Sequence, residues 1–376
     1  MIFAGPFRSG LRACRGEDAI KRLGWLLAVV VAALAALVRW CPSTQIRGDC
    51  AVGELTAILR VPGMVDQLRD PWVGLANGRR FSSYFFVATR WRILPPFIGH
   101  VLHLTPHTYL NLPRVGAWCV LLLGAWYAHR MGGARAAWVA ALGLAGSAAW
   151  LSSVEMVQFD GWYLALLLVA AFSPRTVAAW AAAALGPWID ERFVLFLPAA
   201  LLVRLAWSRR LPWRELSGVG FYALARMAAL FLGEAGLSRQ LGLTVLGWGA
   251  GGCAVGWGLG WRLGWVLLLA GAWKVFGSVR PWQRWLSIGA AAGIAAAAAL
   301  AIDYTRTAPG LLPLAVLGAA HLSSRTRWMA VAVAVMLLNF ALPYWHIYGR
   351  DFAPVRSVFS APPGTWVMPF TMPPLN

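Results

Sequence analysis

The chain has 376 residues, of which 60% are hydrophobic and only 12% are charged, and its mean hydropathy is +0.63. Soluble domains carry about 25% charged residues, so this composition excludes an ordinary large soluble protein and indicates that most of the chain lies in lipid. The net charge of +19 comes almost wholly from arginine, because Lys21 and Lys274 are the only lysines. These arginines are scattered between apolar segments, which argues against nucleic acid as a partner.

Residues 1–22 form a basic segment that is expected to stay in the cytoplasm, since positive charge favours that side. The apolar run Leu23–Val38 follows. It ends in Arg39 and Trp40 without a small-residue cleavage site, which predicts an uncleaved first transmembrane helix rather than a signal peptide. We therefore expect an integral multi-pass protein of the bacterial plasma (inner) membrane.

Residues 41–112 are predicted to form a long exoplasmic loop with amphipathic segments that lie along the membrane surface. Pro95-Pro96 argues against a straight span through this region. Cys41 and Cys50 flank the start of the loop and could pair in an oxidising periplasm, which the sequence leaves open.

The rest of the chain is predicted to continue as helical hairpins, so that 23–344 form one transmembrane domain of about 10–12 membrane segments in an all-α bundle. Basic turns between the runs are expected inside and acidic turns outside. The alternation fails over 241–279, because this segment has two apolar runs although the charges on its two sides require one crossing. A re-entrant run is favoured over an inverted C-terminal half. Residues 345–376 read as an irregular tail rich in proline and aromatic residues. The apolar runs lie near 115–128, 136–151, 161–172, 176–189, 193–207, 217–232, 241–261, 263–279, 285–302, 308–321 and 328–344.

The acidic residues are unevenly placed. Nine of the 14 fall in segments predicted to be outside, although the chain is strongly basic. Ionisable groups near membrane depth are costly and commonly functional, so this asymmetry marks the outer side as the place to look for a site. The nine are Asp49, Glu54, Asp66, Asp70, Glu155, Asp160, Asp190, Glu191 and Asp303.

The turn Asp190-Glu191-Arg192 joins two apolar runs without an intervening loop. The run before it, Thr176–Ile189, spans only about 21 Å as a helix, against a hydrocarbon core of about 30 Å. The turn is therefore predicted to be recessed and to line a wet cavity, where non-helical backbone is tolerated. The alternative is a self-neutralising cluster of ion pairs.

A second turn repeats this arrangement, with Asp303 and Arg306 three residues apart and able to share a helix face. Here too a self-neutralising pair is the alternative. Asp160, in a third outer turn, is either part of the same site or a marker of solvent. His100, His103 and His107 have a helical spacing that could seat a metal, but Pro106 interrupts it, and interfacial histidines are favoured. No nucleotide-binding or hydrolase motif occurs.

This order of elements resembles the GT-C class of polytopic glycosyltransferases, which take sugars from polyprenyl-phosphate carriers. The resemblance rests on a cytoplasmic N-terminus, one span, and a long outer loop with early acids, Asp49 in "RGDC" and Glu54 in "GEL", followed by hairpins with acid/arginine turns. It covers topology over about residues 1–230. The chain departs from the class in having no DxD or ExD in the first loop and no large soluble C-terminal domain.

The resemblance implies a transferase that moves a sugar from a lipid-linked donor to an acceptor on the outer side. A carboxylate would serve as general base, with Asp49 as the first candidate and Glu54 as the second. Arginines or a divalent cation, Mg²⁺ or Mn²⁺, would stabilise the departing phosphate. No residue is assigned as a metal ligand. Asp190, Glu191 and Asp303 would position the acceptor or a metal, and Arg192 and Arg306, with Arg90 or Arg92, would face the phosphate. Asp160 is the remaining predicted substrate-binding residue.

Two other classes stay open. A transporter or flippase of a lipid-linked or anionic substrate also has short, broken helices with charges near midplane. A non-catalytic membrane subunit could use its charged turns to dock a partner. An enzyme site should bring together residues of the first loop and the later turns, whereas a transport path should continue to the other side.

Overall fold

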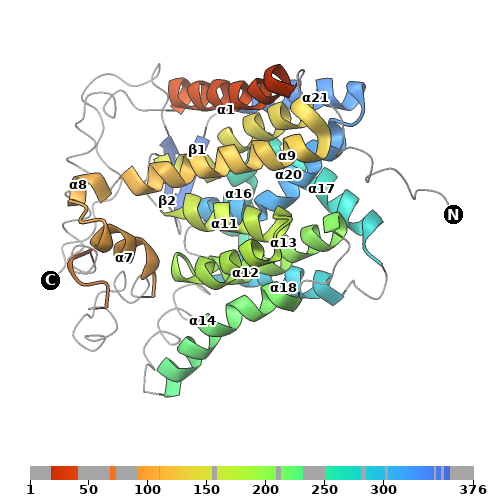
Figure 1. The fold of residues 1–376 in the computed structure, drawn as a ribbon. Helices are drawn as coiled ribbons and strands as arrows, with labels where there is room; N and C mark the ends of the chain where they lie inside the picture. The colour runs from red at the N-terminus through yellow and green to blue at the C-terminus, as the bar shows by residue number, and fades with distance from the viewer. Residues whose placement is uncertain are drawn as a thin grey trace.

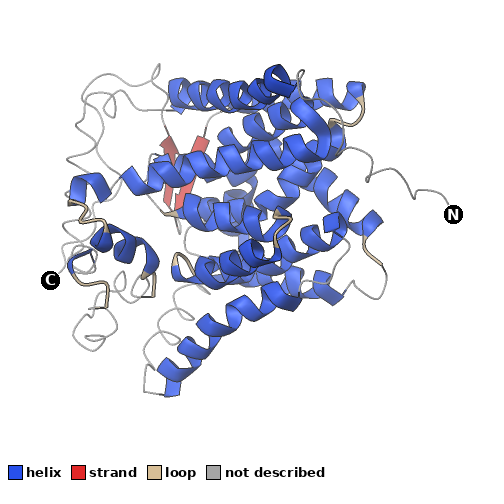
Figure 2. Cartoon of the chain, viewed as in Figure 1, coloured by secondary structure: helices blue, strands red, loops and turns tan. Residues whose placement is uncertain are grey.

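A computed structural model describes residues 18–40, 68–72, 91–109, 111–154, 159–208, 213–231, 250–280, 285–300, 304–342, 344–348 and 351–355. Over these residues the protein is an all-α bundle with one small antiparallel β-hairpin (Figures 1 and 2). The predicted all-α class is therefore confirmed.

The first half of the bundle is built around α9, Asn111–Ala145, which packs against α1, Asp18–Trp40, and α11, Asp160–Phe172. Gly133 has φ 73° and ψ −167°, a conformation that side chains disfavour, and the ribbon bends sharply there (Figure 1). The predicted turn between the runs 115–128 and 136–151 is thus a reversal within α9. The other elements of this half are α7 (Leu94–Val101), α8 (Pro106–Tyr109), α10 (Ala148–Val154), α12 (Thr176–Leu185) and the short 3-10 helix η1 (Gly186–Trp188).

In the second half, α14 packs on α12 and α20 packs on α9 of the first half, whereas α18 packs on α13 and α20 also packs on α17 within the second half. Helices α16 and α17 are joined through η2. The elements are α13 (Arg192–Ser208), α14 (Trp213–Phe231), α16 (Ala250–Trp261), η2 (Arg262–Gly264), α17 (Trp265–Ser278), α18 (Trp285–Leu300), α19 (Tyr304–Thr307), η4 (Ala308–Leu311), α20 (Leu312–Leu322) and α21 (Thr326–Ala341).

The chain after α21 departs from the irregular tail expected from the sequence. Strand β1, Tyr344–Tyr348, pairs antiparallel with β2, Asp351–Val355, in the register Tyr344 to Val355. Aromatic and β-branched residues are frequent in both strands and favour this structure, and the proline and glycine content of the segment concealed this signal. Figure 2 shows the hairpin beside the helices rather than extended away from them.

One helix within the described residues is both long and apolar enough to cross a membrane: Ala254–Ser278, with 25 residues and a hydropathy of 1.2. The pair α9 and α10 passes the same test together but is bent by 54°. Four other apolar helical stretches, Gly24–Leu37, Asp160–Phe172, Trp285–Ala297 and Thr326–Ala341, are shorter. By length and composition alone, one or two spans are supported rather than 10–12. The stretch over 254–278 is interrupted by η2, so it joins two helices and leaves the choice between a re-entrant run and an inverted C-terminal half a prediction.

Candidate functional site

Six charged side chains from four separate segments meet in one ion-pair network: Arg92, Asp160, Asp190, Glu191, Arg192 and Arg306. We call these residues the charge network. All six were predicted as substrate-binding residues from the sequence, and the structure brings them together. Of the other candidates, Asp49, Glu54, Arg90 and Asp303 lie outside the described residues, as do Cys41 and Cys50.

Asp160, the first residue of α11, is the buried centre of the charge network and is 1% exposed. Arg306 binds it through two hydrogen bonds, from Nε to Oδ2 and from Nη2 to Oδ1, each 2.8 Å long. Arg192 donates from Nη2 to Oδ1 at 2.5 Å. Two guanidinium groups therefore share one carboxylate. The two-bond contact of Arg306 is the strong, planar kind of ion pair.

Asp190 connects this centre to the outer part of the network. Its Oδ1 accepts from the backbone N–H of Arg192 at 3.0 Å and from the Arg192 Nε at 2.9 Å, while Oδ2 lies 2.8 Å from the Arg192 Nη2. On its other side, Asp190 Oδ2 is 3.1 Å from the Arg92 Nη1. Asp190 is therefore buried and paired from both sides, whereas the depth of the turn in a membrane and the wet cavity predicted for it stay predictions.

Arg92 and Glu191 form the exposed edge of the charge network. Arg92 donates from Nη2 to Glu191 Oε1 at 3.1 Å and from Nε to Oε2 at 3.3 Å. The Glu191 side chain is 44% exposed and that of Arg92 is 25% exposed. Arg92 belongs to the first long loop, so this edge joins the loop to the later turn.

Three glycines fix the segments that carry these charges. A Cβ on Gly161 would overlap the backbone of Gly116 and Ala117, so α11 begins in direct contact with α9. The Phe193 ring lies against Gly186, and the Phe196 ring lies against Gly310. Five of the six charged residues, all except Arg92, are therefore held within six residues of a close-packed glycine contact, because only glycine leaves room for the neighbouring group.

The charge network is electrically balanced, with three carboxylates and three guanidinium groups. Burial by itself would raise the pKa of the Asp190 carboxyl, but Arg192 and Arg92 outweigh burial and hold that pKa well below its usual value. Asp190 is therefore an anion at neutral pH and a poor general base. The self-neutralising arrangement considered from the sequence is realised here, but its partners come from distant segments as well as from the same turn.

The donor set of the charge network does not suit the divalent cation that the resemblance implied. Mg²⁺ binds oxygen ligands, yet each carboxylate here already accepts from arginine. Within the described ranges, no group of three His, Cys, Asp or Glu side chains is placed to hold a metal ion. His100 and His103 therefore belong to no such group. The His100 Nδ1 contacts the Leu68 carbonyl oxygen at 3.2 Å.

Aromatic side chains that the sequence reading missed surround the charge network. Tyr163 is fully buried, with the Arg192 guanidinium 5.2 Å from its ring centroid. Tyr222 packs edge-on against Trp188 at 5.2 Å, and Trp91 lies 6.2 Å from Trp188. An apolar aromatic wall strengthens the ion pairs because it excludes water. These aromatic residues are scattered along the sequence, so no periodic pattern predicted that they would meet.

A second buried ion pair was also missed. Arg204 Nη2 lies 2.8 Å from Glu215 Oε1, and Arg204 Nη1 donates to the Ser173 carbonyl at 2.8 Å. Arg204 follows Arg192 by 12 residues on α13, about 18 Å along the helix. Helix α13 thus has a buried, paired arginine near each end. The position of Arg204 inside an otherwise apolar run was the sequence signal that could have predicted this ion pair.

Fold and site together define a class: an all-α bundle with a buried, balanced acid/arginine network that ties a loop to three later segments. No protein family model, no curated protein and no solved structure matches the chain.

Proposed function

We propose that this protein is a polytopic membrane protein. The support comes from large apolar side chains on the outer faces of helices that are individually short. Phe221 on α14, Trp273 on α17 and Ile288 on α18 are each more than two-thirds exposed. Exposed apolar surface of this kind, repeated on separate helices, is stable in lipid and unfavourable in water.

Within that membrane, we infer that the protein is a glycosyltransferase that moves a sugar from a polyprenyl-phosphate carrier to an acceptor on the exoplasmic side. The observation that carries this proposal is the meeting of Arg92, from the first long loop, with Asp190 and Glu191 of a later turn. An enzyme of this kind needs the loop and the hairpin turns to act on one substrate.

In this reaction the acceptor hydroxyl oxygen attacks the anomeric carbon of the sugar. The bond from that carbon to the phosphate oxygen breaks, its electron pair leaves with the phosphate, and the hydroxyl proton passes to a carboxylate. Asp49, or Glu54 as second candidate, is proposed as this base, because the described carboxylates of the charge network are all engaged by arginine.

Arg92 is proposed to bind the carrier phosphate, because its pair with Glu191 is the most exposed of the network. Solvent screening makes such a pair weak, so Arg92 can exchange Glu191 for the stronger anion. Arg192 and Arg306 are proposed to hold the floor of the site in place through Asp160.

The test is transfer of labelled sugar from a polyprenyl-phosphate donor in membranes that contain single variants. We expect Asp49→Asn to lower the rate by at least about 100-fold and Arg92→Gln by about 10-fold or more. Arg69→Gln, an exposed arginine of the same loop, is the matched control and should leave the rate unchanged. Equal transfer by wild type and both site variants would refute the assignment.

A transporter or flippase of the same anionic lipid is the second candidate. The two buried ion pairs of α13, at Arg192 and Arg204, support it, since ionisable groups inside a membrane bundle also mark substrate and ion pathways. Proteoliposomes distinguish the two: movement of the lipid across the bilayer without transfer of sugar would favour the transporter. If the proteoliposomes show neither sugar transfer nor lipid movement, the remaining reading is a non-catalytic membrane protein.

A further inference from the structure

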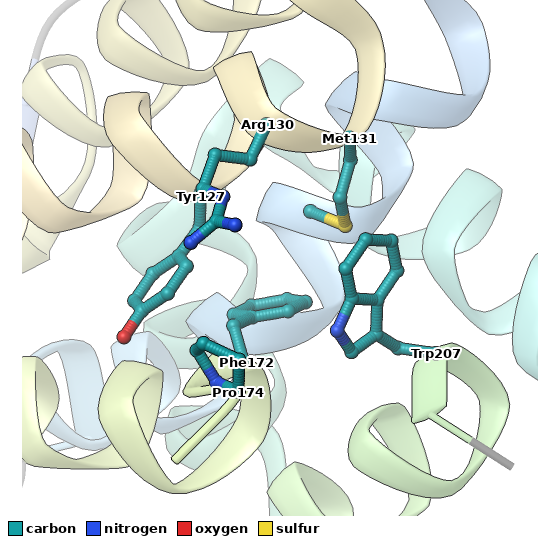
Figure 3. Close-up of a pocket in the computed structure, with 6 residues that line it drawn as sticks. All are labelled: Tyr127, Arg130, Met131, Phe172, Pro174 and Trp207. Atoms are coloured by element: carbon teal, nitrogen blue, oxygen red, sulfur yellow. The ribbon is translucent and has the colours of Figure 1, made fainter. Parts of the chain in front are cut away.

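A small pocket lies at the end of the bundle where α9 bends. It is a cavity of about 40 Å³ lined by Tyr127, Arg130, Met131, Phe172, Pro174 and Trp207 (Figure 3). Trp207 is 15 residues beyond Arg192 on α13, about 22 Å along the helix. The pocket is therefore separate from the charge network, and its ligand rests on the membrane location proposed above but not on the transferase activity.

Arg130 is the charged group of this pocket. Figure 3 shows its guanidinium beside Tyr127 on one side of the hollow, with Met131 and Trp207 on the other. The guanidinium lies 5.2 Å from the centroid of the Trp126 ring, a cation–π contact that orients it. Among the described residues, no carboxylate lies within ion-pair distance of Arg130, whereas nearby Arg204 is already neutralised by Glu215.

The remaining walls are apolar or aromatic. A ligand that suits them has one compact negative group for Arg130 and an apolar part for Met131, Phe172 and Trp207. The cavity has the space of about three water molecules, which fits a phosphate group but is too small for a sugar ring. A guanidinium is the side chain best suited to phosphate oxygens.

The surroundings add a further argument. Arg175, which follows Pro174 of the pocket wall, and Arg325 both lie in basic turns. Basic pockets between membrane helices on the basic side of a protein bind anionic lipid head groups. We propose that the Arg130 pocket binds the phosphate of an anionic membrane phospholipid.

The test uses the purified full-length protein in a neutral detergent and follows its thermal midpoint. Phosphatidylglycerol, phosphatidylcholine and inorganic phosphate are added separately at matched concentrations. We expect phosphatidylglycerol to raise the midpoint by about 3 °C and the other two to leave it unchanged. Arg130→Gln should abolish the rise, and Arg130→Lys should keep about half of it.

Arg135→Gln is the matched control, because it removes one exposed arginine from the same bend of α9. It should retain the full response to phosphatidylglycerol. An equal loss in Arg130→Gln and Arg135→Gln would replace the pocket by a diffuse basic surface and overturn the proposal. An equal response to inorganic phosphate would overturn the lipid as its source, and an equal response to phosphatidylcholine would overturn recognition of charge.

Discussion

At the residue scale, Asp160 is the side chain on which the charge network depends. It accepts hydrogen bonds from two buried arginines, so its loss leaves both cations without their shared anion. We expect Asp160→Asn to destabilise the protein by about 3–5 kcal/mol, the cost of breaking a buried pair from one side. Thermal melting in detergent would measure it.

Glu191→Gln is the control for this variant, because it removes a carboxylate of the same network that is 44% exposed. Its cost should stay below about 1 kcal/mol. A similar loss in both variants would show that burial of Asp160 has no special energetic role.

The lowered pKa of Asp190 predicts how stability depends on pH. A carboxyl whose pKa is lower in the folded than in the unfolded state stabilises the fold above its unfolded pKa of about 3.8, and this contribution is lost as pH falls through the folded value. The melting temperature of Asp190→Asn should therefore lie below that of wild type by a constant amount from pH 8 to pH 5. The gap should narrow only below about pH 4; narrowing already near pH 6 would contradict the ion-paired state.

The membership of the charge network was predictable from the sequence, but its pairing was not. An acid beside an arginine at the end of an apolar run identified Asp190 and Arg306, and an acid in a predicted outer turn identified Asp160. Their partners depend on which turns meet, and Arg306 is 146 residues from Asp160. The sequence therefore suggested arginines that face a phosphate, whereas the structure shows Arg192 and Arg306 turned toward carboxylates.

At the element scale, the contact between α9 and α11 positions the network. Gly161 touches the backbone of Gly116 and Ala117, with Ala117 N 2.5 Å from where a Cβ would lie. We expect Gly161→Ala to push the start of α11 away from α9 and to cost roughly 1–3 kcal/mol, together with the proposed activity. Melting and transfer assays on one preparation would measure both.

Gly220→Ala is the matched control, since Gly220 lies inside α14 with open space where a Cβ would be. It should be neutral or stabilise by up to about 1 kcal/mol, because alanine favours helix. Equal destabilisation by both substitutions would contradict the close-contact argument.

Helix positions were the easiest part of the fold to predict. The apolar runs coincide with helices because a 3.6-residue period and the scarcity of charges leave few alternatives. The 3-10 break at Arg262, which has φ 48°, could not be foreseen. It depends on tertiary partners: the Arg262 side chain donates to the Gly146 and Leu342 carbonyls.

At the scale of the whole molecule, the charges divide between two ends. The charge network includes Arg92, beside α7, whereas the bend of α9 carries Arg130, which has no carboxylate partner among the described residues. Figure 1 shows α7 and this bend at opposite ends of the bundle. In a membrane, the basic end should face the cytoplasm. Surface labelling of single cysteines would check this orientation.

In a chain without its native cysteines, Asp70→Cys and Arg135→Cys each place a thiol at an exposed position. A membrane-impermeant maleimide added to intact cells should label position 70 and should reach position 135 only after the membrane is permeabilised. Labelling of both positions in intact cells would refute the topology.

The spacing of the charge network along the chain also bears on how the protein is made. Arg192 emerges from the ribosome 32 residues after Asp160, but Arg306 emerges 146 residues after it. During synthesis, Asp160 therefore cannot form its two hydrogen bonds with Arg306 until most of the chain has been translated. A chain interrupted before residue 306 therefore lacks one of the two arginines that neutralise the buried Asp160.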